Sequence, residues 1–435
     1  MGTARITLDR WEDRYAVRMG SVRSSAVRDL FAAASRPEVI SLSGGMPDVG
    51  QIPPDAVARA LSEALKTEAA TALQYGGSEG RLPLREIIVD LMAETGVRLK
   101  ADDIIVTAGA QQGLDLLSKT FLDPGDTVIC EGPSYVGALQ AFSAYEPNVV
   151  AVEMDGDGMR MDLLEAELAT RGPKGAKFIY TIPNFQNPAG VTMTPERRRR
   201  LLELAKAYEI PVVEDDPYGR LRFEGGHILP LRALDSDVIY LGTFSKIFAP
   251  GLRLGWMAAP RPVLAKVLLA KQAADLCGSN FTQVLAEKYF AGGGWRRVLR
   301  SLTDTYHERR DAMLEALAEH FPREAHWTHP EGGFFVWVTL PRHLDATAVL
   351  AEAVEYGVTF APGEGFYADG QGTSCMRLAF CFAEPDAIRE GIRRLGEVLE
   401  DRLAVYRAFV EAGAVAEDTA PAVSGGLKVA GAGPR

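Results

Sequence analysis

Short apolar runs alternate with helical stretches between about residues 100 and 260, and this alternation constrains the fold more than any other feature of the sequence. The apolar runs are DIIVTAG, DTVICEGPSY, FIYTIPNFQNPAG, IPVVEDDPYG, VIYLGTFSK and RLGWMAAP. Such a pattern is typical of an α/β domain in which helices cover both faces of a mostly parallel sheet. A chain of 435 residues is also long enough for two or three domains.

The pattern changes after about residue 260, where long helical stretches precede the strand-like runs GGFFVWVTLP, VTFAPG and CMRLAFCF. We therefore expect a second, smaller α/β domain. The predicted division is an N-terminal arm with the start of the small domain at 1–45, a large domain at 46–300, a small C-terminal domain at 301–412 and a tail at 413–435. The tail is rich in small residues without periodicity, so we expect it to be disordered.

Charge and composition exclude several classes of protein. The chain has 47 Lys and Arg against 58 Asp and Glu, a net charge of −11, which argues against a nucleic-acid partner. Four cysteines without a C-x-x-C pair favour a reducing cytoplasm. The start MGTARITLDRWEDRYAVR lacks a signal peptide's apolar region, and no long apolar stretch follows, so we expect neither export nor a membrane. The six scattered histidines predict no metal site.

A glycine-rich turn precedes one of the predicted helices. The run Gly109-Ala-Gln-Gln-Gly113 follows the strand-like DIIVT and leads into the apolar stretch LDLLSKTFL. Backbone amides at a helix N-terminus can bind a phosphate, although a turn that merely begins the helix is the more common reading. The run is neither a G-x-G-x-x-G motif nor a P-loop, so it predicts no dinucleotide or ATP site.

Polar side chains follow three successive strand-like runs. These side chains are Asn187, Asp215 and Lys246. Each alone would usually be a helix cap or a solvated charge, but the carboxyl ends of parallel strands meet at one crevice. Lys246 also comes shortly before Arg253, and both burial and a positive neighbour would lower the pKa of a lysine from about 10.4. The three strand ends therefore predict one reactive site with a nucleophilic amine.

Eight phrases spread from about residue 20 to 400 point to a known family: LQYGGSEGRLPLRE, TAGAQQGLDLL, GPSYVGAL, PNFQNPAG, VVEDDPYG, GTFSKIFAPGLRLGW, PEGGFFVW and CMRLAF. In these phrases the chain resembles the fold-type I enzymes that use pyridoxal 5'-phosphate (PLP), within the class I/II aminotransferase family. The resemblance is greatest to the branch of 2-aminoadipate and kynurenine aminotransferases. It implies a large α/β domain, with a mostly parallel seven-stranded sheet between helices, and a smaller α/β domain.

The resemblance implies which residues hold the cofactor ring. Lys246 is implied to form a Schiff base with the aldehyde of PLP and to carry the proton, and Asp215 to pair with the pyridinium nitrogen. Tyr218 and Asn187 are implied to hydrogen-bond the phenolic oxygen of the ring, and Tyr135 to stack on its face. A core tyrosine is the alternative reading of Tyr135.

The cofactor's phosphate is implied to lie on backbone amides and side chains of four segments. The residues around it are Ala110, Gln111, Thr243, Ser245 and Arg253, with Tyr75 reaching it from a partner subunit. The resemblance thus implies a homodimer with shared active sites. Many relatives have Ser or Thr where Ala110 stands, so one hydroxyl contact worth about 1 kcal/mol is absent here.

Arg377 is implied to bind the α-carboxylate of the substrate through two hydrogen bonds, with help from Asn187 and the backbone of Gly45. A structural ion pair is the alternative reading of Arg377. Arg28 corresponds to an arginine that can meet a distal substrate carboxylate in this branch, but its sequence context differs, and pairing with Asp29 or another acid is the favoured alternative.

The activity that the resemblance implies is transamination between an L-amino acid and a 2-oxo acid, in two half-reactions with ping-pong kinetics. One alternative is another PLP reaction on the same scaffold, such as β- or γ-elimination, replacement or C–C bond formation on an S-adenosylmethionine-like or other amino-acid substrate. A second alternative is a transcription regulator that carries an aminotransferase-like domain. We expect it less, because little sequence precedes the arm where such regulators have a winged-helix domain.

Overall fold

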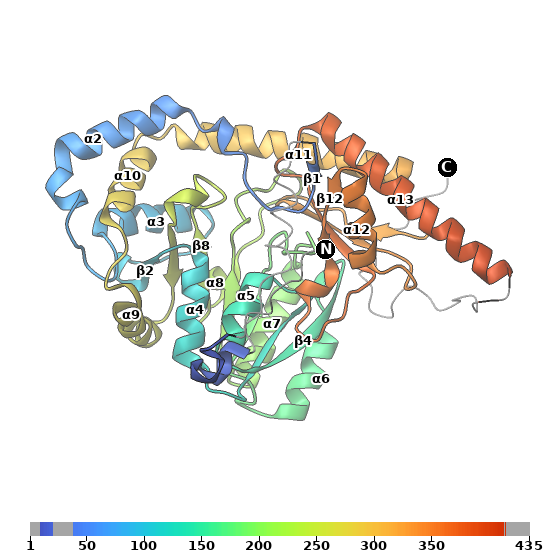
Figure 1. Ribbon diagram of the computed structural model, residues 1–435. Helices are drawn as coiled ribbons and strands as arrows, with labels where there is room; N and C mark the ends of the chain where they lie inside the picture. The colour runs from blue at the N-terminus through green and yellow to red at the C-terminus, as the bar shows by residue number, and fades with distance from the viewer. Residues whose placement is uncertain (1–8, 21–37, 413, 415–435) are drawn as a thin grey trace.

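The structure is a computed structural model of the chain and describes residues 9–20, 38–412 and 414. Among these residues the predicted doubly covered sheet is present (Figure 1). In spatial order its strands are β2 (Ile104–Thr107), β9 (Gly255–Ala258), β8 (Ile239–Thr243), β7 (Val212–Asp215), β6 (Phe178–Thr181), β3 (Thr127–Gly132), β4 (Asn148–Asp155) and β5 (Gly158–Met159). The first seven form the expected sheet, with β9 antiparallel to both neighbours. The eighth, β5, is a two-residue strand antiparallel to β4, too short to stand out in the sequence.

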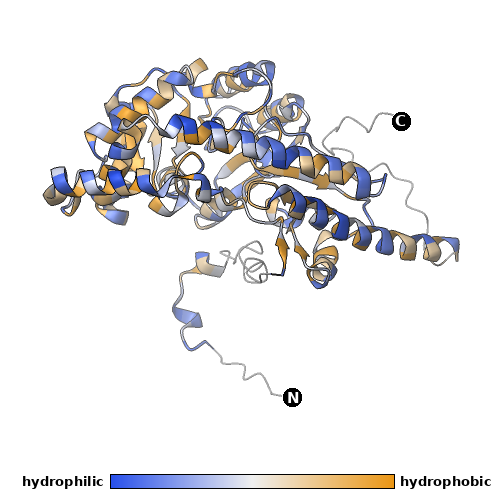
Figure 2. Ribbon diagram, turned by 90° about the horizontal axis from the view of Figure 1, so that it is seen from above, coloured by the Kyte–Doolittle hydropathy of each residue, from blue (hydrophilic) through white to orange (hydrophobic). Residues whose placement is uncertain are grey.

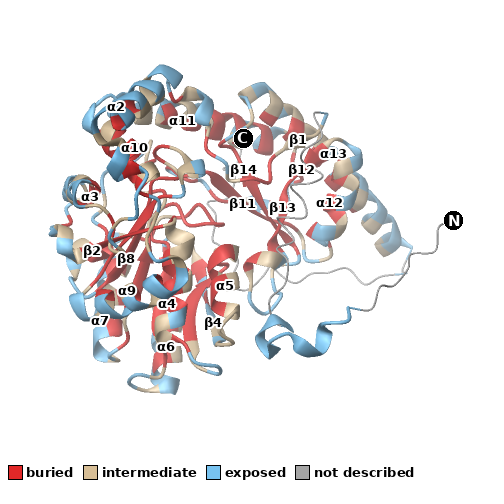
Figure 3. Cartoon of the chain, turned by 60° about the vertical axis from the view of Figure 1, so that its left-hand side comes forward, coloured by how far each residue is buried: buried red, intermediate tan, exposed pale blue. Residues whose placement is uncertain are grey.

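Helices cover both faces of this sheet. They are α2 (Pro54–Ala72), α3 (Leu82–Glu94), α4 (Ala110–Phe121), α5 (Val136–Ser143), α6 (Met161–Arg171), α7 (Pro195–Ala207), α8 (Leu231–Leu234), α9 (Arg261–Asp275) and α10 (Asn280–Ala291). Alternate residues of the strands enter two separate cores: Phe178 packs with α4 and α5 on one face, whereas Ile179 packs with α6 and α7 on the other. Most strands are consequently buried on both sides (Figure 3), whereas β4, near the edge of the sheet, has exposed residues.

Another core, called the second core below, lies beside the sheet and the cores on its two faces. Its strands are β10 (His326–Trp327), β11 (Phe335–Thr339), β14 (Cys375–Ala379) and β13 (Ala361–Pro362) in one sheet, and β1 (Ile40–Ser41) paired with β12 (Val358–Thr359) in another. Its helices are α11 (Trp295–His320), α12 (Ala346–Glu355) and α13 (Pro385–Glu411). The apolar face of α13 repeats every three or four residues, and Figure 2 shows this helix striped in blue and orange.

Short 3₁₀ helices complete the described elements: η1 (Glu12–Arg14), η2 (Val17–Gly20), η3 (Val49–Gln51), η4 (Ala101–Asp103), η5 (Pro250–Leu252) and η6 (Gly363–Phe366). Nowhere in the described part of the chain is a helix long and apolar enough to cross a membrane.

The part of the molecule built on the large sheet and the second core meet along α11. Trp295, its first residue, packs in a core of the large sheet, whereas Leu302 to Leu317 pack with α13 (Figure 1). We propose that these two parts are the two domains and that the first turns of α11 connect them. The proposed division lies near residue 300, which is also the boundary that the sequence predicts. Most of the predicted tail, 413–435, lies outside the described residues.

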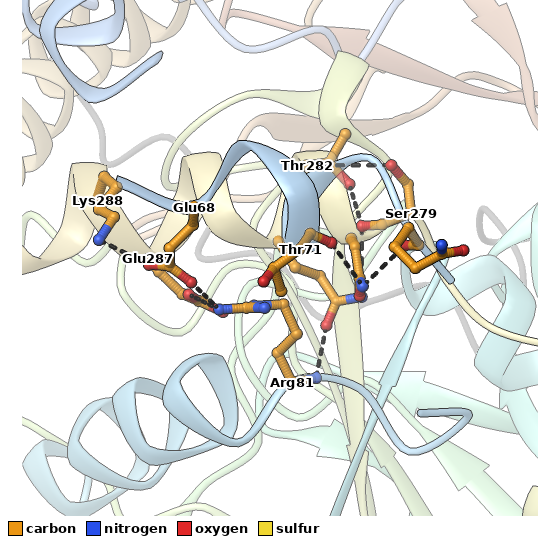
Figure 4. Close-up of polar contacts among 10 residues, drawn as sticks. Glu68, Thr71, Arg81, Ser279, Thr282, Glu287 and Lys288 are labelled. Atoms are coloured by element: carbon orange, nitrogen blue, oxygen red, sulfur yellow. Dashed lines mark hydrogen bonds and ion pairs between the residues drawn. The ribbon is translucent and has the colours of Figure 1, made fainter. Parts of the chain in front are cut away.

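An ion-pair network fixes the loop between α2 and α3 (Figure 4). Arg81 Nε lies 2.7 Å from Glu287 Oε1 on α10, and Arg81 Nη2 lies 2.7 Å from Glu68 Oε2 on α2. Lys288 Nζ reaches the other oxygen of Glu68 at 2.8 Å. The backbone N–H of Arg81 also donates to Gln283 Oε1 at 2.9 Å. These contacts join three helices around residues 73–80, the loop that carries Tyr75.

We expect Arg81→Met to lower the free energy of unfolding by about 3 kcal/mol, because the buried Glu287 carboxylate would lose its cation. Chemical unfolding of the full-length protein measures the effect. Lys288→Met is the matched control, since its partner Glu68 keeps Arg81 and the pair is more open to water, so the loss should stay below about 1 kcal/mol. Equal losses in the two variants would contradict this account of the network.

Candidate active site

Lys246 lies just beyond the end of β8, with its amine directed at the loop after β1. Its Nζ donates to the carbonyl of Gly45 at 2.7 Å and lies 5.9 Å from the centre of the Tyr218 ring. The pKa of Lys246 is lowered from 10.5 to about 8, mainly by burial; the Cys381 thiol opposes this change, and the positive charges of Arg377 and Arg253 contribute to it. The geometry therefore provides an amine that is partly neutral at physiological pH, as the sequence predicts.

Asp215 is the last residue of β7 and is 3% exposed. Its Oδ2 accepts a hydrogen bond from the hydroxyl of Tyr180 at 2.8 Å, whereas its Oδ1 is buried without a partner among the described residues. Burial raises the pKa of Asp215 to about 7, against the lowering effect of the Tyr180 hydrogen bond. A buried carboxylate oxygen without a donor is uncommon in a folded protein and fits a cationic N–H supplied by a ligand.

Gly109 and Arg253 form a cradle at the start of α4. Gly109 has φ +77° and precedes the helix, whose first amides, those of Ala110 and Gln111, lack intrahelical partners. A Cβ on Gly109 would lie 2.6 Å from Arg253 Nη2. Arg253 donates to the carbonyls of Pro250 and Ala108 and, among the described residues, pairs with no carboxylate. Free amides beside an unpaired guanidinium fit a phosphate.

The two hydroxyls predicted for the phosphate lie next to each other. Thr243 Oγ1 lies 3.0 Å from Ser245 Oγ and accepts from the backbone N–H of Ser245 at 3.1 Å. Tyr135 immediately precedes α5, and its hydroxyl donates to Gln111 Oε1 at 3.3 Å. Burial raises the pKa of Tyr135, and its charged neighbours include Asp215, so this ring lies near both the cradle and the carboxylate.

We expect Gly109→Ala to weaken the binding of PLP about tenfold, because alanine at φ +77° is strained and its Cβ would displace Arg253. Titration of the apoprotein with PLP measures the affinity. Gly172→Ala is the matched control: Gly172 has φ +75° with nothing within 4 Å of the added Cβ, so it tests the backbone strain alone. A similar loss of affinity in both variants would contradict the proposed contact with Arg253.

Arg377, on β14, is a buried cation without an acidic partner among the described residues. Its Nη1 donates to Asn187 Oδ1 at 2.9 Å and its Nη2 to the carbonyl of Ser43 at 2.6 Å. Its guanidinium carbon lies 4.1 Å and 4.9 Å from the ring centres of Phe335 and Phe366. Burial lowers the pKa of Arg377 to about 10, and its Nε has no partner in the same part of the chain. A desolvated guanidinium held in this way fits a carboxylate ligand.

The remaining predicted residues differ in how the structure places them. Tyr218 is buried, with its ring edge-on to Phe334 and Phe335, close to Lys246. Tyr75 is 77% exposed, so its predicted contact with a partner's cofactor stays a prediction. Arg28 lies outside the described residues.

Sequence reasoning missed two contributions to this site. The sequence around Tyr180 predicts an ordinary strand residue. Only the pairing of β6 with β7 brings its hydroxyl to Asp215. Phe335 and Phe366 bring their rings close to the Arg377 guanidinium from separate elements, and no spacing in the sequence signals that arrangement.

A further group of ionisable side chains lies outside this site. One ligand atom each of Glu224, His307 and Asp311 fall within 4.8 Å of one another. Arg310 donates to Glu224 at 3.0 Å and to Asp311 at 2.8 Å, so an ion-pair network accounts for the group.

Comparison with known proteins identifies the family. Residues 37–395 match the family described as Aminotransferase class I and II. The chain belongs to this family.

Two solved aminotransferases and one curated relative are similar over nearly the whole chain. The aromatic-amino-acid aminotransferase 1 of Thermococcus litoralis is 44% identical and covers 91% of this chain and 96% of that protein. The kynurenine aminotransferase of Pyrococcus horikoshii, in complex with PMP, is 43% identical with a TM-score of 0.87, over 91% of this chain and 99% of that chain. LysN, the α-aminoadipate aminotransferase of Thermus thermophilus, complexed with N-(5'-phosphopyridoxyl)-L-leucine, is 36% identical with a TM-score of 0.84, over 91% of this chain and 99% of that chain.

These matches confirm the expected branch and fold. The aminotransferase transfers an amino group between an amino acid and a 2-oxo acid, and its cofactor is pyridoxal 5'-phosphate. The alternative of elimination, replacement or C–C bond formation is not favoured by these relatives.

Proposed function

We propose that this aminotransferase holds PLP at the crevice beyond the strand ends. Lys246 would link to the aldehyde, Asp215 Oδ1 would take the ring N–H, and Asn187 and Tyr218 would hold the phenolic oxygen. The open oxygen of Asp215 and the lowered pKa of Lys246 support these roles. Tyr135 would lie against the ring. The residues proposed for the phosphate are Ala110, Gln111, Thr243, Ser245 and Arg253.

Bound PLP would supply an aldehyde that links to amines and a ring that accepts the electrons of a broken Cα–H bond. The remaining work falls to the chain. Arg377 would fix the substrate α-carboxylate through two parallel N–H donors, with Asn187 beside it, and so set the direction of the Cα–H bond. Lys246 Nζ would remove the Cα proton of the amino donor and move it to the carbon that carried the aldehyde oxygen. In the second half-reaction it would supply a proton to the Cα of the accepting 2-oxo acid.

The observation that carries this proposal is that Arg377 is buried without an acid among the described residues. Its backbone acceptor and that of Lys246 lie on the same short loop. Ser43 accepts from Arg377, and Gly45, two residues on, accepts from Lys246. A cation for a carboxylate and an amine for chemistry therefore meet at one segment of backbone. An α-amino acid has a carboxylate and an amino group on one carbon, which matches a cation and an amine that lie close together.

The loading of PLP should depend on pH. Because only the neutral amine attacks an aldehyde, we expect the rate of linkage to Lys246 to rise with pH and to level off above about 8, the pKa of Lys246 in the cofactor-free protein. Stopped-flow absorbance after mixing apoprotein with PLP measures the rate. Arg377→Met should move the midpoint to higher pH, since it removes a positive charge that lowers this pKa. A rate that is flat from pH 6 to about 9 would contradict the assignment.

We propose that the preferred amino donors are amino acids with large side chains, of the aromatic or 2-aminoadipate type. The names of the relatives suggest this preference. A panel of aromatic, acidic and aliphatic L-amino acids, added to the holoenzyme with products identified by mass, tests this. Conversion of the bound cofactor to the amino form together with a 2-oxo acid is the expected result. Release of ammonia, a free side-chain substituent and a shortened 2-oxo acid, with the cofactor left in its aldehyde form, would instead indicate elimination.

We further propose a homodimer in which Tyr75 reaches the partner's phosphate cradle. Leu73 and Tyr75 are at least three-quarters exposed, and Ser78 of the same loop donates to the carbonyl of Leu276, whose side chain is also exposed. Exposed apolar side chains gathered in this way are typical of an interface.

Mixing two defective variants tests this arrangement. If Tyr75 serves the partner's site, Lys246→Ala mixed with Tyr75→Ala should recover activity, because the mixed dimer has one site with both residues intact. If Tyr75 serves its own site, every site in the mixture lacks one residue, and no recovery is expected. Sedimentation velocity gives the mass of the assembly.

A further inference from the structure

Tyr180 links the core of the large sheet to the carboxylate of the candidate site. It lies on β6, where it pairs with Cys130 of β3 and Val213 of β7. The side chain is fully buried on the face covered by α4 and α5, edge-on to Phe142 with ring centres 5.4 Å apart. Its hydroxyl donates to Asp215 Oδ2 at 2.8 Å.

This hydrogen bond leaves Asp215 asymmetric. Oδ2 is satisfied by Tyr180, and Oδ1 is buried without a donor among the described residues. A carboxylate with a rotating terminal bond would otherwise present either oxygen to a ligand. A fixed donor on one oxygen holds the plane of the group and leaves the other oxygen with a defined direction.

We propose that Tyr180 is a positioning residue for PLP: its hydroxyl holds Oδ2 of Asp215, so that Oδ1 faces the ring nitrogen as an ionised carboxylate. The inference rests on the proposed role of Asp215. Tyr180 itself touches neither cofactor nor substrate in this account and acts through Asp215.

Electrostatics agree with the geometry. Burial alone pushes the Asp215 carboxyl toward its neutral form, and the nearby Asp216 adds to this rise in pKa. The Tyr180 hydrogen bond acts in the opposite direction. Burial and Asp215 raise the pKa of Tyr180 well above its ordinary value of 10, so the phenol stays a donor. A neutral Asp215 would not keep the ring nitrogen protonated, and loss of the Tyr180 hydroxyl favours that neutral form.

The test is Tyr180→Phe in the full-length protein, which removes one atom. Its matched control is Tyr240→Phe: Tyr240 lies on the neighbouring strand β8, is also buried, and donates to Asp216 Oδ2 at 3.1 Å instead of to Asp215. The Kd of pyridoxal 5'-phosphate should rise about tenfold or more in Tyr180→Phe, as expected for loss of a hydrogen bond to a charged group. It should stay within about twofold of wild type in Tyr240→Phe.

A spectroscopic titration separates positioning from a structural role. A positive ring nitrogen disfavours a second proton on the linked Lys246 nitrogen, so Tyr180→Phe should move the pH midpoint of the bound cofactor's absorption to higher pH. Tyr240→Phe should leave it unchanged. A lost affinity with an unchanged midpoint, or an equal change in both variants, would overturn the proposal.

Two additional variants keep the outcome decisive. Fluorotyrosines at position 180 preserve shape and fold while making the phenol more acidic, and the midpoint should move with that acidity; no movement would overturn the proposal even if Tyr180→Phe does not fold. Asp215→Asn tests the underlying role. If Asp215→Asn binds PLP like wild type, the proposed function of Asp215 fails; if only Tyr180→Phe is without effect, the positioning role alone fails.

Discussion

Replacing Lys246 with alanine should abolish turnover, with a loss of at least about a thousandfold under saturating amino acid. Lys246 Nζ contacts the Gly45 carbonyl in the loop after β1, two residues from the Ser43 carbonyl that accepts from Arg377. The pKa of Lys246 is lowered to about 8, mainly by burial. The variant loses both the nucleophile and the proposed carrier of the Cα proton. Single-turnover conversion of the bound cofactor by an amino acid measures the loss.

The same variant should still bind PLP, because the cradle at the start of α4 is intact. The cofactor should however dialyse away, since no covalent link retains it. Lys266 is an exposed lysine on α9, and Lys266→Ala is the matched control. This variant should keep both its turnover and its bound cofactor. Undiminished turnover in Lys246→Ala would remove Lys246 from the mechanism. Loss of PLP binding with an unfolded spectrum would show only damage to the fold, which circular dichroism detects.

Replacing Arg377 with methionine should lower kcat/KM for amino acids about a hundredfold or more, because a desolvated, two-donor contact with the α-carboxylate disappears. Arg377→Lys should recover little, since an ammonium cannot supply the planar pair of donors. Steady-state kinetics with the best donor from the panel measure both. The Kd of PLP should stay near wild type, which distinguishes a substrate contact from a cofactor contact.

Arg377→Met should also leave the melting temperature of the apoprotein no lower than in wild type. Among the described residues the wild-type guanidinium is buried without an acid, and burying such a charge costs stability that an apolar side chain of similar length does not. Lost activity together with retained stability is the signature of a binding residue. A large fall in melting temperature would instead mean that the bonds to Asn187 and Ser43 hold the fold.

The sequence contains enough to predict the large sheet and three of its strand ends. Asn187, Asp215 and Lys246 each follow a continuous apolar run, and parallel strands bring such ends to one edge regardless of side-chain detail. The two-residue strand β5 escapes prediction because it has no periodicity of its own.

Contacts between segments that are distant in the sequence could not be predicted in this way. Tyr180 reaches Asp215 only because β6 and β7 pair in one particular register, and a tyrosine in a strand is usually a core residue. The two rings near the Arg377 guanidinium come from β11 and η6, which are far apart in the sequence. Such positions depend on packing, and packing is a property of the whole chain rather than of a local pattern.

The two ends of the candidate site belong to different cores. Arg377 is carried by β14 beside the core of α11 and α13, whereas Asp215 and Lys246 lie at the ends of strands of the large sheet. An amino acid held at both its carboxylate and its α-carbon would bridge the two parts, which the chain connects through α11 and also through the segment between β1 and α2. Such a substrate would add a contact between the two parts that an amine without a carboxylate could not make.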